Sequence, residues 1–415
     1  MKNNPKVYGE REMDTVLFII TFLLVLIGVI MILSASAYSA ARAGNEFHNF
    51  IMQILGACIG FVAILVARNL KFEIITSWLT WAFYLFSIVL LIATIFLGHS
   101  VQGATRWLQI GPVQIQPSEI SKIAIILALS VYLANDRGKG PSKIDTLPGA
   151  IVCIFIVALP VILVIIPGGM STAIILAAIG FVICFVSSAY IKRFVLLGVF
   201  GIIGIVSLLF FGGGFREGRV FAWLNPYADA AGMGFQTIQS LYAIASGGLF
   251  GLGLGNSNQK LNFLPEAHND FIFAIIVEEM GILGGIIILI LFAILIWRAT
   301  LIAIKCTKPS GSLIATGVLT MISVQVLINV GVVTNTIPNT GIPLPFISYG
   351  GTSIVVMMAA IGLLLNVSRY QKIEDSMIIY AKQGNENKKD HNLTKDNGRI
   401  IKNRDLQNKI YKRRA

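Results

Sequence analysis

The sequence predicts an all-α membrane protein, a polytopic bundle of about ten transmembrane helices with one large outer loop. Of its 415 residues, 56% are hydrophobic and 13% are charged, whereas an average soluble domain is roughly 25% charged. The segment 15–37 holds 23 residues without a charge, which is more than the ~20 that cross a bilayer. Apolar runs of this kind recur along nearly the whole chain, so a soluble globular protein is excluded.

Ten apolar segments are long enough to be predicted as membrane-spanning helices. In chain order they are 15–37, 49–67, 74–97, 118–134, 147–166, 170–189, 194–211, 270–294, 312–335 and 349–368. The first is too long for the apolar region of a signal peptide and precedes no clear cleavage pattern, so we expect it to be retained as a helix. We divide the chain into an N-terminal tail (1–14), the ten-helix domain (15–368) with its large outer loop (212–269), and a C-terminal tail (369–415).

The distribution of Lys and Arg predicts the orientation of the bundle. With the N-terminus inside, 26 of the 32 basic residues fall in cytoplasmic segments. Only Arg42, Arg106, Arg216, Arg219 and Lys260 fall outside, and Lys122 lies within a span. Because basic residues concentrate in cytoplasmic segments of membrane proteins, we predict a multi-pass protein of the cytoplasmic membrane with both termini in the cytoplasm.

The C-terminal tail carries much of the net charge. It contains 13 Lys and Arg against 6 Asp and Glu, which is +7 of the total of +12. A basic tail directly after an apolar helix favours an extension beside anionic lipid headgroups over nucleic-acid binding. Its polar composition predicts disorder.

The cysteines predict no disulfide and no metal site. Cys58, Cys153 and Cys184 fall inside predicted helices and Cys306 in a cytoplasmic loop, so none lies on the outer face where oxidation acts. The sequence also lacks a phosphate-binding loop of the G-x-x-x-x-G-K-[ST] type, so ATP-driven work is not expected.

Two charged residues lie near the start of the fourth predicted helix. Glu119 and Lys122 are three residues apart, which places them on one helix face as an ion pair directed into the bundle. Charges at bilayer depth cost at least ~2.5–3.5 kcal/mol, so each needs a reason. The pair either fixes helix packing or forms a charged wall of an outward-facing cavity near Arg106, and we favour the cavity wall.

Three titratable residues crowd the start of the eighth predicted helix. Glu266, His268 and Asp270 lie within five residues of one another where a polar loop becomes an apolar helix. An acid in that place can be a simple helix cap. Neighbouring, partly desolvated carboxylates have raised pKa values, however, and a raised pKa suits a general base. Deeper in the same helix, Glu278 and Glu279 are expected to form helix-to-helix hydrogen bonds.

Two stretches of the outer segments are rich in glycine and proline. The stretch 246–255 precedes no strand-turn-helix pattern, so close backbone packing or a re-entrant segment is favoured over dinucleotide binding. The stretch 339–353, which includes Ser348, combines rigid prolines with permissive glycines at a helix entrance. Such a combination can hold backbone and hydroxyl groups at a fixed cavity mouth.

At these residues the sequence resembles the SEDS family (shape, elongation, division, sporulation), the RodA/FtsW/SpoVE proteins of bacteria. The matching stretches are Gly103–Trp107, Gln116–Glu119, Asn225–Pro226, Gln236, Gln239–Ser240, Gly247–Gly251, Lys260–Leu261, Leu264–Phe273 and Pro338–Ser353. They are ordered along most of the chain.

Two positions depart from the family pattern. The turn Pro167-Gly168-Gly169 lacks the acid usual there, and Asn262 stands where some division-type members carry a further acid. The sequence 332–335, Val-Val-Thr-Asn, leans toward the division or sporulation branch.

The resemblance implies ten helices around a cavity open to the outer leaflet and an activity that polymerises lipid II into peptidoglycan strands. It implies that Asp270 is the essential acidic residue and that Glu119 and Lys122 line the same cavity. It also implies a class B penicillin-binding protein, a transpeptidase, as partner. The roles in cell division, sporulation and cell shape remain open alternatives.

The residues agree with such chemistry. Lipid II carries a lipid diphosphate as leaving group, so Asp270 would act as base for the attacking hydroxyl. Cations would stabilise the phosphates. No nucleophilic cysteine or Ser-His pair is evident, which favours direct displacement with inversion. No organic cofactor is expected, and a divalent cation such as Mg or Mn could share the work of the basic residues. The expected substrate-binding residues are Glu119, Lys122, Arg106, Arg216, Arg219, Glu266, His268 and Ser348.

Two other functions compete with a glycosyltransferase. A flippase or transporter of lipid-linked precursors would explain ten helices and intramembrane charge. Alternating access, however, favours a binding site near the midplane, whereas the charges here gather at the outer end. A scaffold that only recruits a partner enzyme through its helices is the third alternative.

Overall fold

The structure, a computed structural model, confirms nine of the ten predicted membrane spans. It describes residues 13–42, 47–101, 104–111, 113–134, 142–190, 195, 198, 215–261 and 263–371. The helices long and apolar enough to span a membrane within these ranges are α1 (Thr15–Arg42), α2 (His48–Asn69), α4 (Trp78–Leu97), α5 (Pro117–Ala134), α6 (Leu147–Ile165), α7 (Met170–Ser187), α11 (Ile272–Lys305), α12 (Pro309–Val333) and α13 (Gly351–Ser368). The predicted span 194–211 lies outside the described residues, except for Val195 and Gly198. So do the tails before residue 13 and after residue 371.

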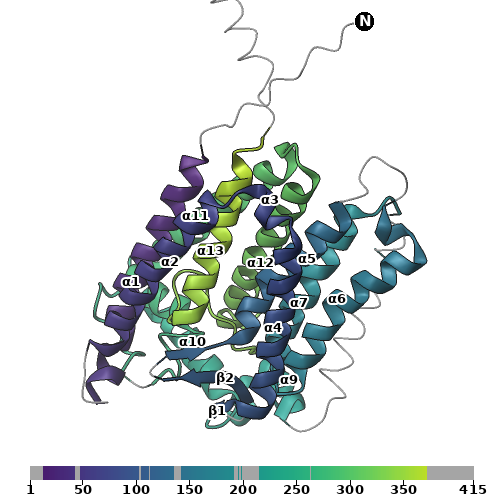
Figure 1. Ribbon diagram of the computed structural model, residues 1–415. Helices are drawn as coiled ribbons and strands as arrows, with labels where there is room; N and C mark the ends of the chain where they lie inside the picture. The colour runs from purple at the N-terminus through teal and green to yellow at the C-terminus, as the bar shows by residue number, and fades with distance from the viewer. Residues whose placement is uncertain are drawn as a thin grey trace, which may run out of the picture. The chain divides into compact units, whose positions relative to one another are not determined.

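The helices differ strongly in how much of their surface is covered by protein. In the most apolar window of α5, 83% of the residues are buried, and in α13 72% are, against 28% in α2 and α6. Apolar side chains such as Ile59, Val62 and Phe155 stay exposed on the outer helices, where lipid can cover them at no cost. Polar side chains on α5 can therefore find protein partners, and Figure 1 shows this helix among the others of the bundle.

Helices α2 and α13 approach each other closely because glycines lie at their contact. A Cβ added to Gly362 of α13 would lie 2.8 Å from the carbonyl oxygen of Ile64, and one added to Gly60 of α2 would collide with Met358. Without a hydrophobic driving force between helices in lipid, such tight backbone packing is what stabilises the helix pair.

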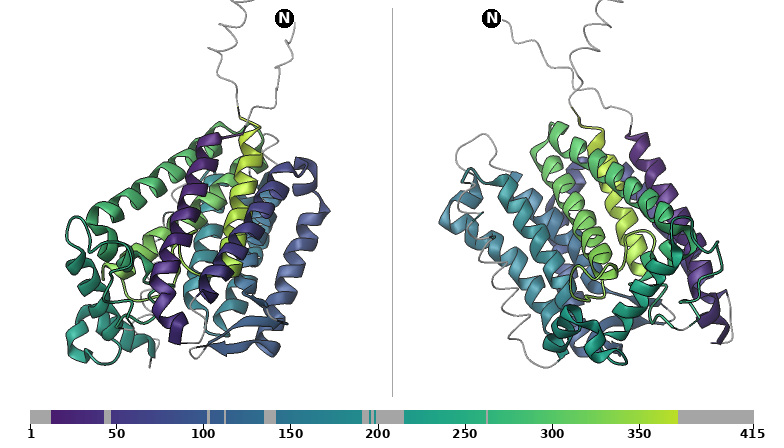
Figure 2. Two further views of the ribbon diagram at one scale, coloured as in Figure 1. Left: turned by 90° about the vertical axis from the view of Figure 1, so that its left-hand side faces the viewer. Right: turned by 180° about the vertical axis from the view of Figure 1, so that it is seen from behind.

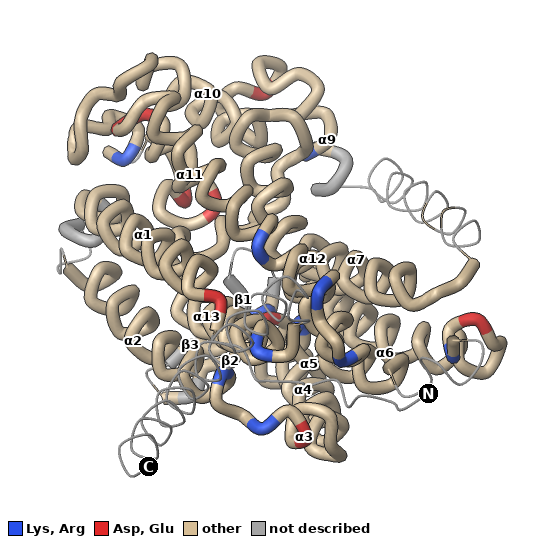
Figure 3. Tube along the Cα trace, turned by 90° about the horizontal axis from the view of Figure 1, so that it is seen from above, with Lys and Arg blue, Asp and Glu red and all other residues tan. Residues whose placement is uncertain are grey.

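The helix ends define two faces of the bundle. The first turn of α1 meets the last turn of α13, because the backbone N–H of Asp14 donates to Ser368 Oγ at 3.2 Å. Asp14 also binds Arg298 of α11, with a shortest N···O distance of 2.6 Å. We call this face the termini end. Figure 3 looks down on it and shows how sparse the charged residues are among the helices.

The opposite face carries a small sheet that the all-α prediction lacked. Its strands β1 (His99–Val101), β2 (Ala104–Ile110) and β3 (Val113–Ile115) run antiparallel in the order β1-β2-β3. We call this face the sheet end. Figures 1 and 2 show it at the far side of the bundle from the start of α1.

Much of the predicted outer loop 212–269 is helical in its described part. It forms α9 (Phe215–Leu224), the 3₁₀ helix η2 (Pro226–Asp229) and α10 (Phe235–Gly247) at the sheet end, as the view from behind in Figure 2 shows. Short helices also occur at the termini end, α3 (Phe72–Ile75) and η1 (Lys143–Asp145).

Helix α11 is broken at Gly281, which has φ 74° and ψ 178°. The segment after α10 crosses the break and supplies the missing hydrogen bonds. The amides of Leu252 and Gly253 donate to the carbonyls of Glu278 and Glu279 at 2.9 and 3.0 Å, and Ile282 N donates to Gly248 O at 2.9 Å. The prediction of close backbone packing for the glycine-rich stretch is therefore confirmed.

Candidate active site

Asp270 lies at the sheet end, two residues before α11 begins. Its side chain is partly buried, and it faces the turn that contains Gly341, since a Cβ added to Gly341 would lie 3.1 Å from Asp270 Oδ2. Asn329 of α12 holds this arrangement, because its Nδ2 donates to the carbonyl of Asp270 at 2.7 Å and to that of Ile342 at 2.8 Å. One amide thereby fixes both chain segments around the carboxylate.

The surroundings of Asp270 raise its pKa from 3.8 to about 7. Burial is the largest cause, and the negative charge of Glu266 adds to it, whereas Arg106 and Arg219 oppose the increase. Burial disfavours the charged form of a carboxyl group, and opposite charges favour it. The result is a carboxylate that can gain and lose a proton near neutral pH, as a general base must.

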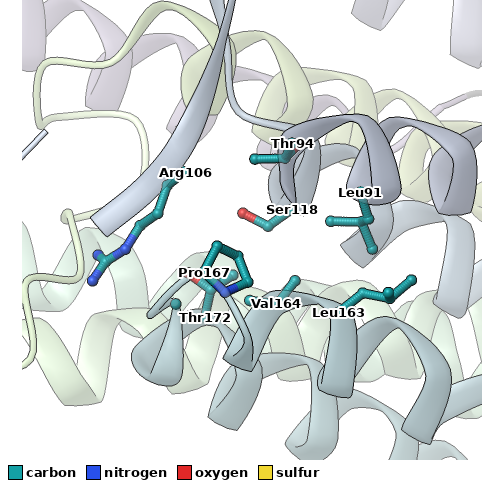
Figure 4. Close-up of a pocket in the computed structure, with 9 residues that line it drawn as sticks. Leu91, Thr94, Arg106, Ser118, Leu163, Val164, Pro167 and Thr172 are labelled. Carbon is teal, nitrogen blue, oxygen red and sulfur yellow. The ribbon is translucent and has the colours of Figure 1, made fainter. Parts of the chain in front are cut away.

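Arg106 reaches the site from β2. Its Nη2 donates to the carbonyl of Gly168 at 2.8 Å, and its Nε is buried without a hydrogen-bond partner among the described residues. Burial lowers the pKa of Arg106, and the charge of Asp270 raises it. Figure 4 shows the guanidinium pointing away from the apolar wall formed by Leu163 and Val164.

Arg219 of α9 also interacts electrostatically with Asp270. Its Nη1 donates to the carbonyl of Asn339 at 3.1 Å. Burial and the nearby Arg106 lower its pKa, and Asp270 raises it. Two arginines from distant parts of the chain thus converge on one carboxylate, which is an arrangement suited to binding anionic oxygen atoms. Arg216 lies in the same helix, but its side chain lies outside the described part of the structure.

The other residues of the predicted cluster shape the turn before α11. Glu266 has a φ of 56°, and its carboxylate accepts a hydrogen bond from Asn269 Nδ2. The His268 ring packs edge-on against Tyr349, with ring centroids 5.7 Å apart. Burial lowers the pKa of His268, whereas the negative charge of Glu266 raises the pKa of this histidine.

Ser348 ties this turn to the start of α13. Its hydroxyl donates to the carbonyl of Asn269 at 2.7 Å and accepts from the amide of Leu344 at 2.7 Å. Since its hydroxyl already bonds two backbone groups in this structure, its geometry is that of a residue that holds the turn in place.

Glu119 and Lys122 form the predicted ion pair, with Nζ 2.6 Å from Oε1. Lys122 also donates to Gln325 Oε1 of α12 at 3.3 Å, and Ser353 of α13 donates to Glu119 Oε2 at 3.3 Å. The side chains are 1% and 4% exposed, and neither lines the two hollows described below. The hydrogen bonds of the pair join α5, α12 and α13.

Glu278 and Glu279 face the bundle, but their partners are mainly loop residues. Glu279 binds Lys260 Nζ at 3.0 Å and accepts from the hydroxyl of Ser34 of α1 at 2.6 Å. Glu278 accepts from the Ser257 hydroxyl and from the amide of Asn258 at 3.1 Å. The expected helix-to-helix hydrogen bonds are confirmed by Ser34 of α1 on Glu279 and by Ser246 of α10 on Glu278, and the loop contacts at the break in α11 add to them.

Two hollows lie at the arginines that interact with Asp270. The first is narrow and largely apolar, and lies between α4, α6 and α7 with Arg106 at its edge (Figure 4); its other lining residues are Leu91, Thr94, Ser118, Leu163, Val164, Pro167, Gly169 and Thr172. The second is a cavity of about 420 Å³ formed by α9, η2, α10 and the turns that carry Pro265 and Asn339. Arg219 lines this second cavity, which we call the outer cavity.

The described residues assemble no group of three or more His, Cys, Asp or Glu that could hold a metal ion. Asp270 and Glu266 supply two neighbouring carboxylates, and Mg²⁺ is commonly held by one or two carboxylates together with water and substrate phosphates. These two residues would therefore fit a cation that arrives with the substrate phosphates, and a Mg or Mn requirement stays a prediction.

Several residues that position the site were not singled out from the sequence. Asn329 and Gln325 are uncharged polar residues in an apolar span, and both are buried. Polar side chains inside a span are costly unless they are bonded, so this signal could have identified them. The turn Pro167–Gly169 carries no acid, yet its Gly168 carbonyl binds Arg106, and no side-chain pattern could have revealed a backbone contact.

The chain matches known proteins over most of its length. The family profile described as cell cycle protein, FtsW/RodA/SpoVE, matches residues 14–373. Stage V sporulation protein E of Bacillus subtilis is 41% identical over 364 residues, which cover 86% of this chain and 98% of that protein. A probable peptidoglycan glycosyltransferase FtsW of Trichlorobacter lovleyi is 35% identical and covers 89% of this chain and 96% of its own.

Solved structures share the fold. A chain of a peptidoglycan synthase complex that coordinates polymerization and crosslinking superposes with a TM-score of 0.72 at 27% identity, covering 87% of this chain and 99% of that one. The rod shape determining protein RodA of Thermus thermophilus superposes with a TM-score of 0.64 at 24% identity, covering 87% and 98%. At that identity the second likeness concerns the fold alone.

Proposed function

The chain belongs to the FtsW/RodA/SpoVE family of cell cycle proteins, and on this basis we propose that it is a peptidoglycan glycosyltransferase that polymerises lipid II. Relatives 33–35% identical carry the name of that activity. The observation that supports it best is Asp270, a carboxyl group with a pKa near 7 that faces two arginines at the sheet end.

The geometry supports a direct displacement. Asp270, deprotonated, takes the proton from a sugar hydroxyl as that oxygen attacks the anomeric carbon of the second substrate. The bond from that carbon to the diphosphate breaks, and the lipid diphosphate leaves with the bonding electrons. One new glycosidic bond forms with inverted configuration.

Arg106 and Arg219 act on the leaving group. Charge develops on the diphosphate oxygens as the bond breaks, and fixed cationic donors stabilise such charge best in a partly desolvated site. Arg106 keeps a buried Nε without a partner among the described residues, and both arginines are oriented by backbone carbonyls. Removal of either should therefore lower the rate of the chemical step more than it weakens substrate binding.

We propose that the sheet end faces outward and that both termini lie in the cytoplasm, which the positive-inside pattern of the sequence supports. The chain is a multi-pass membrane protein, and we place it in the cytoplasmic membrane. The stage V sporulation relative and the FtsW relatives favour a role in sporulation or division. We further propose a class B penicillin-binding protein as partner, which the likeness to a chain of a peptidoglycan synthase complex supports.

The test is polymerisation of lipid II by the purified protein in detergent, with the product resolved on a gel. Wild type should form glycan strands, and Asp270→Asn should form none while remaining folded, because an amide keeps the size and hydrogen-bonding capacity of the side chain but cannot accept the proton. Near-normal polymer from Asp270→Asn would overturn its role as the base.

The same purified protein distinguishes the proposed glycosyltransferase from a flippase. Reconstituted in vesicles, a flippase would move lipid-linked precursor between leaflets without extending it. A wild type that moves precursor and forms no polymer would overturn the proposed activity. The gathering of charge at the sheet end argues against that outcome, because alternating access favours a binding site near the midplane.

A further inference from the structure

The residues that line the outer cavity differ in type from those around Asp270 and in the apolar hollow. Its lining combines two aromatic side chains, Trp223 and Phe235, with two amides, Gln236 and Asn339, and one carboxylate, Asp229. Its volume of about 420 Å³ falls in the range of roughly 300–1,000 Å³ typical of small-molecule sites.

The outer cavity shares walls with the Asp270 site. Pro265 begins the turn that leads to Asp270, and Asn339 lies two residues before Gly341, which faces Asp270 Oδ2. Arg219 lines the cavity and also interacts electrostatically with Asp270. The outer cavity is therefore the hollow into which we expect a molecule reacting at Asp270 to extend.

The polar groups of the wall argue against an anionic or a lipid ligand. The carboxylate of Asp229, which accepts from the amide of Met233 at 2.8 Å, would repel a diphosphate, and Arg219 is the one basic residue of the lining among the described residues. An acyl chain would offer no hydrogen bond to any donor or acceptor that the wall itself leaves unsatisfied, which is costly. The cavity is also built by α9, η2 and α10 rather than by the long spanning helices.

A neutral sugar fits the same wall. Carboxylate and amide oxygens accept from sugar hydroxyls, amide and guanidinium groups donate to them, and aromatic faces cover the apolar face of a sugar ring. Gln236 and Asn339 already bond each other at 2.8 Å, so the amides are held in place before a ligand arrives.

We propose that the outer cavity, which shares no lining residue with the apolar hollow at Arg106, binds the uncharged sugar units next to the reacting ring. This inference rests on the proposed glycosyltransferase activity and names the saccharide subsite of that site. The amphiphilic substrate then has its phosphates at Arg106 and Arg219 and its sugars against the remaining wall of the outer cavity.

Two neighbouring alanines provide a matched test. Ala231 lines the outer cavity and Ala230 does not, and both are exposed in the same turn after η2. Ala231→Trp narrows the cavity without removing a polar group, and Ala230→Trp adds the same bulk outside it. We expect Ala231→Trp to raise the KM for lipid II about tenfold, as loss of one binding contact does, and to shorten the glycan products, whereas Ala230→Trp behaves like wild type.

A direct binding measurement keeps the test independent of catalysis. The probe is chitotetraose, a tetrasaccharide without lipid or phosphate, and the readout is the fluorescence change that wild type shows and Trp223→Phe lacks. We expect Asp270→Asn and Ala230→Trp to retain the change and Ala231→Trp to lose it. If Ala231→Trp proves unfolded in thermal melts, Gln236→Leu, which keeps the side-chain volume and removes the amide, should raise KM in the same way.

The outcomes distinguish the two proposals. Absence of polymer from wild type would overturn the proposed function. Polymer from wild type together with equal KM, product length and chitotetraose response in Ala231→Trp and Ala230→Trp would overturn the saccharide subsite and leave the activity standing.

Discussion

The protonation state of the Asp270 carboxyl group is coupled to the stability of the folded protein. Its folded-state pKa of about 7 exceeds the ordinary value of 3.8, so between these two pH values the folded protein holds a proton that the unfolded chain has released. Stability therefore falls as pH rises through this window and stays reduced above pH 7. The carboxylate that catalysis needs is thus the form that the fold disfavours.

This coupling predicts that Asp270→Asn stabilises the protein while abolishing polymerisation. The melting temperature of the variant should match wild type most closely near pH 4, at the lower edge of this window, and exceed it by about 2 °C or more at pH 8, because the amide does not ionise. Thermal melts in detergent at a series of pH values would measure the difference, and the wild-type rate should rise with pH through about 7 over the same series. A difference in melting temperature that does not change with pH would contradict the shifted pKa.

The buried pair of Glu119 and Lys122 provides a second residue-scale prediction. Glu119→Lys alone should destabilise the fold by about 3–5 kcal/mol, since it leaves two like charges buried. Adding Lys122→Glu rebuilds the ion pair on the same helix face, and Gln325 and Ser353 can donate or accept with either partner.

We expect the double variant to be folded yet inactive, because the positive charge has moved about one turn along the helix. Melts and lipid II polymerisation measure the two effects separately. Recovery of most of the activity would instead assign the pair to packing alone.

At the residue scale the sequence predicted the charged residues of the site better than the contacts that hold them in place. Asp270, Arg106 and Arg219 were identified because charges are rare in such a chain and each one requires an explanation. Gln325, Asn329 and Asn339, which hold these residues or their neighbours, were not, because uncharged amides stand out less. Contacts to the carbonyls of Gly168 and Asn339 depend on backbone placement, which residue types do not specify.

At the scale of elements, the spans were predictable and the sheet was not. Each described span begins and ends within a few residues of its predicted bounds, except α11, which continues to Lys305 instead of ending near residue 294. The three strands have three to seven residues each and depend on packing against the helices, since isolated short strands are marginal in water. Their local pattern therefore carries little signal.

The break in α11 gives the element-scale prediction. Gly281→Ala should destabilise the protein by more than about 1 kcal/mol, because Gly281 has a positive φ and an added Cβ would lie 2.2 Å from the carbonyl oxygen of Leu249. Polymerisation should fall as well, since the broken segment leads into Asp270.

Gly351→Ala is the matched control in chemical denaturation, because an added Cβ at Gly351, the first residue of α13, meets nothing within 4 Å. Equal stability of the two variants would show that the break tolerates a side chain.

At the scale of the whole molecule, the sequence predicted a ten-span bundle with the site at one end, and the family match covers residues 14–373. The structure describes the C-terminal tail only to residue 371. Most of the tail lies beyond the matched range. We expect protein truncated after Gln383 to polymerise lipid II at the wild-type rate when purified, because the tail is polar and, in the proposed orientation, on the other side of the membrane from Asp270. Loss of activity in the purified truncated protein would contradict this, whereas loss only in cells would indicate recruitment of other factors.

The segment that crosses the break in α11 has a consequence for hydrogen exchange. The amide protons of Leu252 and Gly253 lie outside any helix, but their acceptors are the carbonyls of Glu278 and Glu279, and the adjoining carboxylates bind Ser34, Lys260 and Ser257. These two amides can exchange with solvent only when their bonds to α11 break, and the carboxylate contacts hold the loop against that opening. Deuterium should therefore enter this loop as slowly as it enters the helix beside it, and the loop and the helix should unfold as one cooperative unit.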